Sequence, residues 1–324
     1  MRAVVVENWM EPGELRVSDT QEPEVRPGTL EVEVRAAGCN FFDILMVKGQ
    51  YQVRPPFPFV PGAELAGVVT QVGEGVEGFS VGDRVFGAPG LGAFAERAVV
   101  PAFGTYRLPD AMSFEEGAAL PIIYPTSYMA LVDRAALQPG EDLLVHAAAG
   151  GVGIAAVQIG KALGARVIAT AGGEEKLAIA RENGADDTID YREEDFVARV
   201  KALTEDKGAD VIYDSVGGDV FDKSLKCIAW NGRLLVIGFA SGTIPTVKAN
   251  RILLKNIAVT GLNWGGHAVK QPNKIPETMR ELFALYEAGK IRPVIYRSFP
   301  LDDLPEALAE LGGRRSHGKV IVAP

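Results

Sequence analysis

The stretch Asp142–Gln158, DLLVHAAAGGVGIAAVQ, decides the fold of this chain. Its first six residues form a short, largely apolar run that is typical of a buried strand. A glycine-rich turn, Ala148–Gly153, follows, and small and apolar residues then recur at helical spacing as far as Leu163. Strand, glycine turn and helix in this order expose backbone N–H groups at a helix N-terminus, which is where a pyrophosphate binds. The stretch predicts a dinucleotide site, with a tight turn that holds no ligand as the alternative.

The spacing within the turn is A-x-G-x-x-G, so Ala148 replaces the usual first glycine. Gly150 lets the backbone approach the pyrophosphate, and Gly153 lets the helix pack closely on the strand. We therefore expect the cofactor to contact the run Ala149, Gly150, Gly151, Val152 and Gly153.

Bulk composition excludes several classes of protein. The chain has 324 residues, 47% of them hydrophobic, and a formal net charge of −9, with acidic residues spread along its length. This balance argues against nucleic acid or an anionic membrane as the main partner. No apolar run reaches the roughly 18–20 residues that span a bilayer, and the first residues do not resemble a signal peptide. Cys39 and Cys227 are the two cysteines, which favours free thiols in a reducing cytoplasm.

The rhythm of the sequence predicts two domains. Short β-rich runs, broken by glycine and proline, fill residues 2 to 100 and predict an antiparallel, barrel-like domain. Strands alternate with helices from about Ser113, which predicts a parallel, doubly wound sheet. After Pro276, a helix and two strand-like runs return to the first character. We expect the domains to be 1–117 with 265–324, and 118–264, with the site in the cleft between them. The predicted strands are Arg2–Val6, Thr29–Ala37, Leu65–Val72, Arg84–Phe86, Ala93–Val99, Leu143–Ala147, Arg166–Thr170, Asp187–Ile189, Val211–Tyr213, Arg233–Ile237, Ile257–Thr260, Val294–Phe299 and Lys319–Val322.

Five motifs, in their order and spacing, carry a family resemblance. They are Asn40–Asp43 (NFFD), Pro61–Gly67 (PGAELAG), Val81–Val85 (VGDRV), His146–Gly153 with Gln158, and Asp214–Gly217 (DSVG). With them the chain resembles the medium-chain dehydrogenase/reductase superfamily, in its zinc-free, zeta-crystallin-like quinone oxidoreductase branch, over essentially its whole length.

The resemblance implies an α/β fold made of a GroES-like, β-barrel-type catalytic domain and a Rossmann NADP-binding domain. It implies NADPH-dependent reduction of quinones or other α,β-unsaturated carbonyls by direct hydride transfer. It also implies a homodimer joined through the edge strand Ile257–Thr260.

The end of the second strand of the nucleotide domain indicates the cofactor. NAD sites carry an acid there, about 20 residues beyond the glycine turn, to bind the ribose hydroxyls. This chain has Gly172 and Gly173, which leave room for a 2′-phosphate, and Lys176 follows with a positive charge. The resemblance adds Tyr191 as a second phosphate ligand. We expect NADPH, although Lys176 as an ordinary exposed helix lysine is the alternative.

Zinc ligands of the superfamily's alcohol dehydrogenases are missing. Asn40 and Ala63 stand at the first cysteine and histidine positions, and the region Tyr124–Tyr128 contains no sulfur. Zinc needs three or four nitrogen or sulfur ligands. We therefore expect no metal, and we expect His146 to be a hydrogen-bonded core residue.

The resemblance places the reacting centre at four residues. Asn40 is expected near the nicotinamide ribose or the substrate oxygen, and Asp43 braces its loop, with a helix-start acid as the alternative. Tyr51 is a hydrogen-bond donor to the substrate, a stacking surface or core packing. Thr126, which opens the helix after Pro125, contacts the cofactor or caps that helix.

Further cofactor contacts are expected from the resemblance. Ser215, Phe239, Leu262 and Trp264 are expected along the cofactor, with Trp264 as dimer-interface packing in the alternative. Arg315 and Lys319 are expected to face the cofactor phosphates, with a solvated basic turn as the alternative.

Two other functions stay open from the sequence. One is an enoyl-thioester reductase of the same fold. The other is a crystallin-like protein that binds NADPH without turnover.

Overall fold

The computed structural model describes residues 1–324 as two compact units. The first unit is formed by Met1–Ile122 with Pro293–Pro324, and the second by Ile123–Arg292. The chain thus returns to the first unit at Pro293, whereas the sequence predicted this return at residue 265. The reason is that α10 (Lys274–Glu287) packs on α3 (Ile123–Met129) and on α9 (Trp264–Lys270), all within the second unit.

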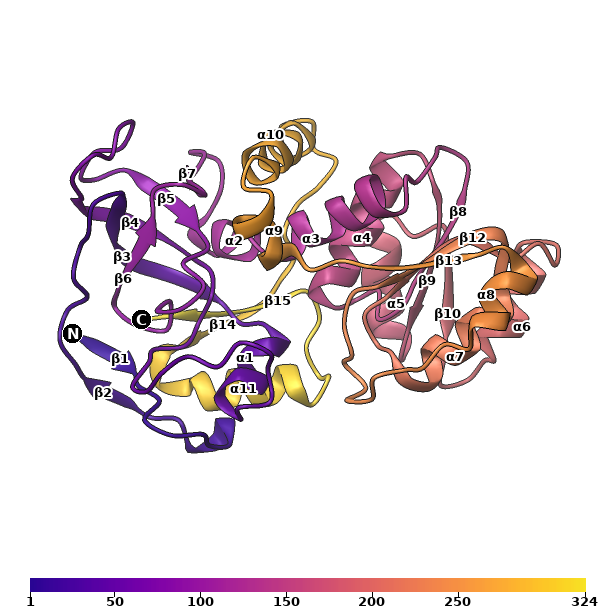
Figure 1. Cartoon of the computed structure of the whole chain (residues 1–324), viewed down its shortest axis with the longest axis horizontal. Coiled ribbons are helices and arrows are strands. Elements are labelled where there is room, and N and C mark those ends of the chain that lie inside the picture. The colour runs from indigo at the N-terminus through magenta and orange to yellow at the C-terminus, as the bar shows by residue number, and fades with distance from the viewer. The chain divides into compact units, whose positions relative to one another are not determined.

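The second unit contains a six-stranded parallel sheet in the order β10-β9-β8-β11-β12-β13 (Figure 1). This is the strand order of a doubly wound dinucleotide-binding fold, as the sequence predicted. Its strands are β8 (Asp142–Val145), β9 (Arg166–Ala171), β10 (Asp187–Asp190), β11 (Ala209–Asp214), β12 (Ile228–Val236) and β13 (Ala258–Gly261). Its helices, besides those above, are α4 (Gly151–Ala162), α5 (Glu174–Glu182), α6 (Phe196–Leu203), α7 (Gly218–Cys227) and α8 (Ala249–Lys255), with a π-helical turn at Ala130–Arg134.

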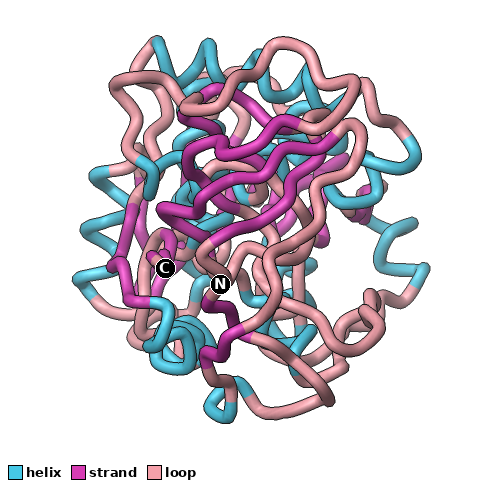
Figure 2. Tube along the Cα trace, turned by 90° about the vertical axis from the view of Figure 1, so that its left-hand side faces the viewer, coloured by secondary structure: helices cyan, strands magenta, loops and turns pink.

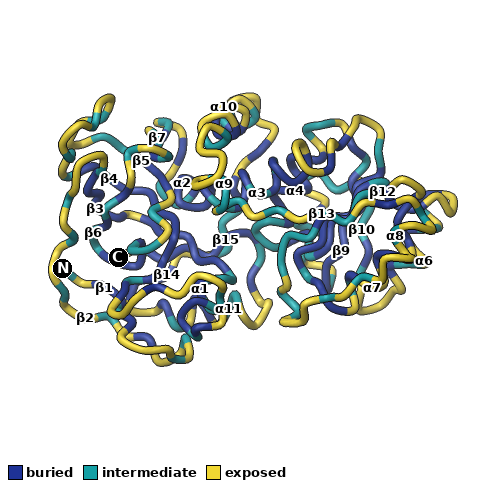
Figure 3. The backbone as a smooth tube through the Cα atoms, in the orientation of Figure 1, coloured by how far each residue is buried: buried dark blue, intermediate teal, exposed yellow.

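The sheet forms because its central strands are apolar on both faces. All four residues of β8 are buried, as are five of the six in β9 and in β11. Helices therefore cover both faces, as parallel sheets require. Figure 3 shows these strands as the most buried part of the second unit, whereas β13 at the edge is only partly covered.

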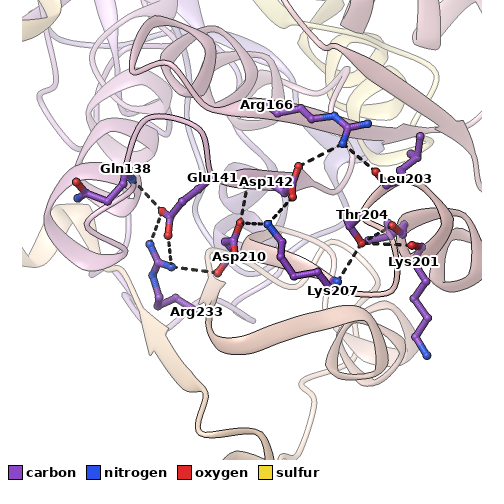
Figure 4. A network of polar contacts seen from close by, with 12 residues as sticks. Gln138, Glu141, Asp142, Arg166, Lys201, Leu203, Thr204, Lys207, Asp210 and Arg233 are labelled. Carbon is purple, nitrogen blue, oxygen red and sulfur yellow. Dashed lines mark hydrogen bonds and ion pairs between the residues drawn. The ribbon is translucent and has the colours of Figure 1, made fainter.

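Charged residues join the amino ends of neighbouring strands (Figure 4). Asp142, which begins β8, accepts ion pairs from Lys207 at 2.7 Å and Arg166 at 3.5 Å. Lys207 also contacts Asp210 on β11 at 2.8 Å. The ion pairs of this network join Glu141, Asp142, Arg166, Asp187, Lys207, Asp210 and Arg233. Because these residues lie at the strand beginnings, the opposite edge is left to the glycine turn that follows β8.

The first unit is built on a mostly antiparallel sheet, whose strands Figure 2 shows side by side. The strand order is β14-β15-β3-β4-β5-β7, with β6 paired to β3, and only the β14–β15 pair is parallel. The strands are β3 (Thr29–Gly38), β4 (Leu65–Val72), β5 (Arg84–Gly87), β6 (Arg97–Pro101), β7 (Thr105–Arg107), β14 (Ile295–Pro300) and β15 (Lys319–Ala323), and β1 (Arg2–Val4) pairs separately with β2 (Val17–Asp19). The helices are α1 (Phe41–Val47), α2 (Phe114–Ala119) and α11 (Leu304–Gly312), with 3-10 turns at Pro12–Glu14 and Leu301–Asp303.

One predicted strand of this unit is displaced. The run Ala93–Val99 was expected to be a strand, but β6 begins at Arg97. The N–H groups of Ala93 and Phe94 instead bond the carbonyls of Gly62 and Pro61, in a loop that crosses the PGAELAG segment. Apolar residues there are buried by loop packing, which the sequence pattern does not distinguish from a strand.

None of the helices combines the length and the apolar character needed to cross a membrane.

Candidate active site

One edge of the parallel sheet carries most of the second-unit residues that are predicted to bind the cofactor. All six strands run in the same direction, so their carboxyl ends lie along a single edge. The sheet order reverses between β8 and β11, and ligands bind at such a switch point. The predicted residues follow the strands in turn: the glycine turn after β8, Gly172 and Gly173 after β9, Tyr191 after β10, Ser215 after β11, Phe239 after β12 and Leu262 after β13.

The glycine turn has the geometry that a pyrophosphate requires. Gly150 is the N-cap of α4 and makes no side-chain capping bond, so the first-turn N–H groups of Gly151, Val152 and Gly153 have no intrahelical partner. A Cβ atom on Gly153 would lie 2.2 Å from the carbonyl oxygen of Ala147, whereas one on Gly150 would lie 3.3 Å from it. Gly153 is therefore needed for the close packing of helix and turn, and Gly150 keeps the approach to the N–H groups open.

The end of β9 is enclosed by the residue predicted to bind a 2′-phosphate. A Cβ atom on Gly172 would lie 2.7 Å from the hydroxyl oxygen of Tyr191, so any side chain there would displace the phenol. The pKa of Lys176, in the first turn of α5, is lowered, chiefly by burial. Glu174, the nearby acid on α5, is held by Arg181 at 2.6 Å. The Gly172 turn thus presents a phenol and a lysine, with the carboxylate of Glu174 engaged elsewhere.

His146 belongs to the core, as predicted. Its Nδ1 lies 3.0 Å from the Thr170 hydroxyl, its Nε2 lies 2.8 Å from the Ser224 hydroxyl, and Phe196 packs against the ring edge to face. Burial lowers the pKa of His146 to about 3, so the imidazole is neutral. Its role is to join β8, β9 and α7 through uncharged hydrogen bonds.

Asn40 lies in a buried polar cluster of the first unit. Its amide nitrogen donates to Glu64 Oε1 at 2.8 Å, and its amide oxygen accepts from Lys319 Nζ at 2.7 Å. Lys319 and Glu64 form an ion pair at 2.5 Å, and the second oxygen of Glu64 accepts the backbone N–H of Ile122 at 3.1 Å. Both polar atoms of the Asn40 amide are therefore fixed, so the side chain has one defined orientation.

Lys319 lies in this buried cluster, which differs from its predicted position. Sequence reasoning placed it toward a cofactor phosphate, or on a solvated turn. The structure instead buries it, because its ammonium neutralises Glu64. Glu64 lies in the PGAELAG motif, and its position there indicates no role by itself. A buried acid between a motif asparagine and a distant lysine is a tertiary pairing that spacing alone does not reveal.

Asp43 is fully buried one helical turn beyond Asn40. One carboxylate oxygen accepts the Asn40 backbone N–H at 2.7 Å, and Oδ1 has no hydrogen-bond partner. Burial raises the pKa of Asp43 to about 7, against the lowering effects of that hydrogen bond and of Lys319. The carboxyl accepts the N–H of the N-cap residue of α1, which is the contact of a helix-start acid, the alternative named for Asp43.

Tyr51 is half-buried and stacks on Phe42, with ring centroids 5.4 Å apart. Burial and the nearby charge of Asp43 raise the pKa of Tyr51, so the phenol stays protonated. A protonated phenol is a hydrogen-bond donor.

Three other predicted residues have specific surroundings. Thr126 was expected to open its helix, but α3 begins at Ile123, so Thr126 lies inside the first turn and Pro125 is tolerated there because it needs no N–H partner. Trp264 is the first residue of α9 and packs on His267 with ring centroids 5.8 Å apart. Arg315 is exposed and pairs with Glu310 at 2.9 Å.

Comparison with known proteins agrees with this geometry. The family models that match are a zinc-binding dehydrogenase domain over residues 151–284 and an alcohol dehydrogenase GroES-like domain over residues 26–110. A quinone oxidoreductase-like protein 2 homolog from Nematostella vectensis is 45% identical over 90% of this chain and 81% of its own length. The crystal structure of Escherichia coli quinone oxidoreductase complexed with NADPH matches with a TM-score of 0.93 and 34% identity, over all of both chains. A mycobacterial protein complexed with NADPH matches equally, with a TM-score of 0.93, 34% identity and full coverage of both chains.

The chain belongs to the quinone oxidoreductase branch of the medium-chain dehydrogenase/reductase superfamily. Both predicted folds, the GroES-like domain and the Rossmann domain, are thereby confirmed. The cofactor in the two similar structures is the one that the sequence predicts for this oxidoreductase.

The structure shows the surroundings of two residues that lie where the resemblance would place zinc ligands. Asn40 bonds Glu64 and Lys319, and Tyr124 donates its hydroxyl to Gln158 at 2.8 Å. The structure contains no group of three or more His, Cys, Asp or Glu side chains arranged to hold a metal ion.

Proposed function

We propose that this chain reduces quinones or other activated α,β-unsaturated carbonyls with NADPH, by direct hydride transfer and without zinc. The observation that carries the proposal is its full-length similarity to a quinone oxidoreductase complexed with NADPH, together with the preserved glycine turn of α4. The reduced nicotinamide supplies the hydride when NADPH is bound.

The second unit would hold the cofactor along the carboxyl edge of its sheet. The N–H groups of Gly151, Val152 and Gly153 would bind the pyrophosphate, because they are uncapped and close to the turn backbone. Lys176 and Tyr191 would bind the 2′-phosphate beside Gly172. Ser215, Phe239, Leu262 and Trp264 are proposed as further contacts along the same edge.

The first unit would supply the polar group at the reacting end. The Asn40 amide is fixed by Glu64 and Lys319, so it would position the substrate oxygen or the nicotinamide ribose at small entropic cost. Tyr51 would donate a hydrogen bond from its protonated phenol to the substrate oxygen. An electron-poor acceptor needs only modest polarisation of its carbonyl oxygen. Neutral hydrogen-bond donors such as the Asn40 amide and the Tyr51 phenol can supply it.

Activity on a panel of acceptors tests the proposal. Purified protein should oxidise NADPH with quinones or enones, use NADH at least about tenfold less well, which corresponds to roughly 1.4 kcal/mol, and fail to oxidise simple alcohols. Enoyl thioesters belong in the same panel, and preference for them would favour the enoyl-thioester reductase. Binding of NADPH without turnover on any acceptor would overturn the enzymatic assignment.

Metal analysis tests the absence of zinc. The protein should contain well below about one zinc per chain, and EDTA should leave its activity intact. Stoichiometric zinc with chelator-sensitive turnover would contradict the proposal.

Variants at the reacting centre test the two donors. Asn40→Ala should lower turnover by about 10–100-fold through lost positioning. Tyr51→Phe should lower kcat by roughly tenfold or more if the phenol donates, and Tyr51→Ala alone should be costly if the ring stacks. Wild-type behaviour of both Tyr51 variants on several quinones would remove Tyr51 from the site.

We further propose a homodimer that pairs through β13, in a reducing compartment such as the cytoplasm. β13 is an edge strand, and Leu253 and Leu254 on the preceding helix are 78% and 71% exposed. Both cysteines are buried free thiols. Light scattering should give twice the chain mass, and a monomer at all concentrations would contradict the pairing.

A further inference from the structure

A second cation lies over the turn that would receive the 2′-phosphate. Arg192 follows Tyr191 beyond the end of β10, and its side chain turns back toward the turn between β9 and α5. A Cβ atom on Gly172 would lie 2.7 Å from Arg192 Nε, and one on Gly173 would lie 3.3 Å from Arg192 Nη1. The guanidinium is therefore held directly above the backbone of both glycines.

No carboxylate neutralises this guanidinium. The one hydrogen bond of Arg192 is made by its backbone N–H, which donates to Asp190 Oδ1 at 2.9 Å. The other oxygen of Asp190 accepts the Gly173 N–H at 3.0 Å, so this acid serves the backbone of the turn. Arg192 is exposed and makes no ion pair, although the chain as a whole carries a net charge of −9.

The positive side chains of Lys176 and Arg192 both lie near the N-terminus of α5, where positive charge is unfavourable. The pKa of Lys176 is lowered first by burial and then by the positive charge of Arg192. Lys176 lies in the first turn of α5, where the helix dipole disfavours positive charge. Repulsion from Arg192 and the helix dipole both disfavour the charged form of Lys176, and the nearby carboxylate of Glu175 offsets part of this effect. An anion bound beside Arg192 would offset the remaining repulsion between the two cations.

We propose that Arg192 is the principal ligand of the NADPH 2′-phosphate and sets the preference for NADPH over NADH. A guanidinium binds phosphate through two parallel N–H groups, whereas the ammonium of Lys176 acts as a point charge. Gly172 is part of the same proposed phosphate site, because a side chain at this position would collide with both Arg192 and Tyr191. This inference rests on the proposed function, because it assumes that NADPH binds at this edge of the sheet.

Direct binding measurements test the role of Arg192 without requiring turnover. Dissociation constants of the full-length wild type, Arg192→Ala and Arg192→Lys are measured for NADPH, NADH, 2′,5′-ADP and 5′-AMP. Arg192→Ala should weaken NADPH and 2′,5′-ADP by roughly 10- to 100-fold, the range of a charge-assisted contact, and leave NADH and 5′-AMP unchanged. Arg192→Lys should recover only part of the loss, because an ammonium lacks the paired donors.

A matched control is Arg199→Ala, which removes an arginine from α6 that contacts Glu194 at 3.4 Å. It changes net charge equally and should leave all four constants unchanged. An unaltered NADPH to NADH ratio in Arg192→Ala, or an equal loss for both cofactors, would overturn the inference. A wild type that binds NADPH no more tightly than NADH would also overturn it. Selective NADPH binding that depends on Arg192, with no turnover on any acceptor, would support the inference while the reductase proposal fails.

Discussion

The two units keep polar groups away from water in opposite ways. In the first unit, Glu64 and Lys319 are buried as a charged pair around Asn40, and Asp43 is buried beside them. In the second unit, His146 is buried as a neutral ring between two hydroxyls. Burying charge costs far more free energy than burying a neutral hydrogen-bonded group. The cluster that fixes the Asn40 amide therefore lowers the stability of the first unit. The second unit has two cations, Lys176 and Arg192, that are not fully buried and that we propose as phosphate ligands.

The largest effect is expected from breaking the buried pair. Lys319→Met leaves Glu64 without a counter-charge and should reduce the free energy of unfolding by about 3–5 kcal/mol in urea denaturation. Glu64→Gln combined with Lys319→Met should restore much of this loss. The control is Lys161→Met, which breaks the more exposed pair with Asp186 and should cost about 0–1 kcal/mol. Equal costs for the two single variants would show that the cluster is not electrostatically special.

The acid of the first unit should make stability fall as pH rises. The folded pKa of Asp43 is about 7, above the value of about 3.9 for an unfolded aspartate, so the folded state holds the proton more tightly. The contribution is fully present below about pH 4 and is lost as pH rises to about 7, on the order of 2–4 kcal/mol. Subtracting the curve of Asp43→Asn from that of the wild type isolates this slope. A difference that rises with pH over this range would contradict the assignment.

The histidine of the second unit should act with the opposite sign. Its folded pKa is about 3, below the unfolded value of about 6.5, so the unfolded chain binds the proton more readily. Stability should fall as pH drops from about 6.5 to 4.5, by roughly 2–3 kcal/mol. His146→Gln should remove this dependence in the same urea experiment. The comparison fails if the wild type and the variant lose stability in parallel.

The smallest effect distinguishes two glycines of one turn. Gly153→Ala places a methyl group against the Ala147 carbonyl and should cost about 1–3 kcal/mol of stability. Gly150→Ala meets only a 3.3 Å contact at an ordinary negative φ and should cost less than about 1 kcal/mol. Thermal unfolding without cofactor measures both. Equal losses would show that the close approach at Gly153 does not constrain the helix.

The sequence predicted the second unit better than the first. Periodicity and glycine spacing located all six parallel strands, because strands alternate with helices and most of these strands are short apolar runs. Local patterns carry no information on which distant residues meet, so the pairing of Glu64 with Lys319 was not foreseen. Arg192 was passed over for the same reason, although it adjoins the predicted Tyr191. The helices α2, α8, α9 and α11 were not predicted. α8 and α9 bury no residue, and Pro305 lies in the first turn of α11.

The ion network at the amino ends of the strands has a consequence for redesigning the protein. Asp142, Lys207 and their partners hold β8, β9, β11 and β12 together at the edge opposite the turns proposed to bind the cofactor (Figure 4). Substitutions at Gly172 or Arg192 therefore leave these cross-strand contacts untouched. An engineer who wishes to convert the cofactor preference can alter the carboxyl edge as an independent module, with the scaffold anchored from the other side.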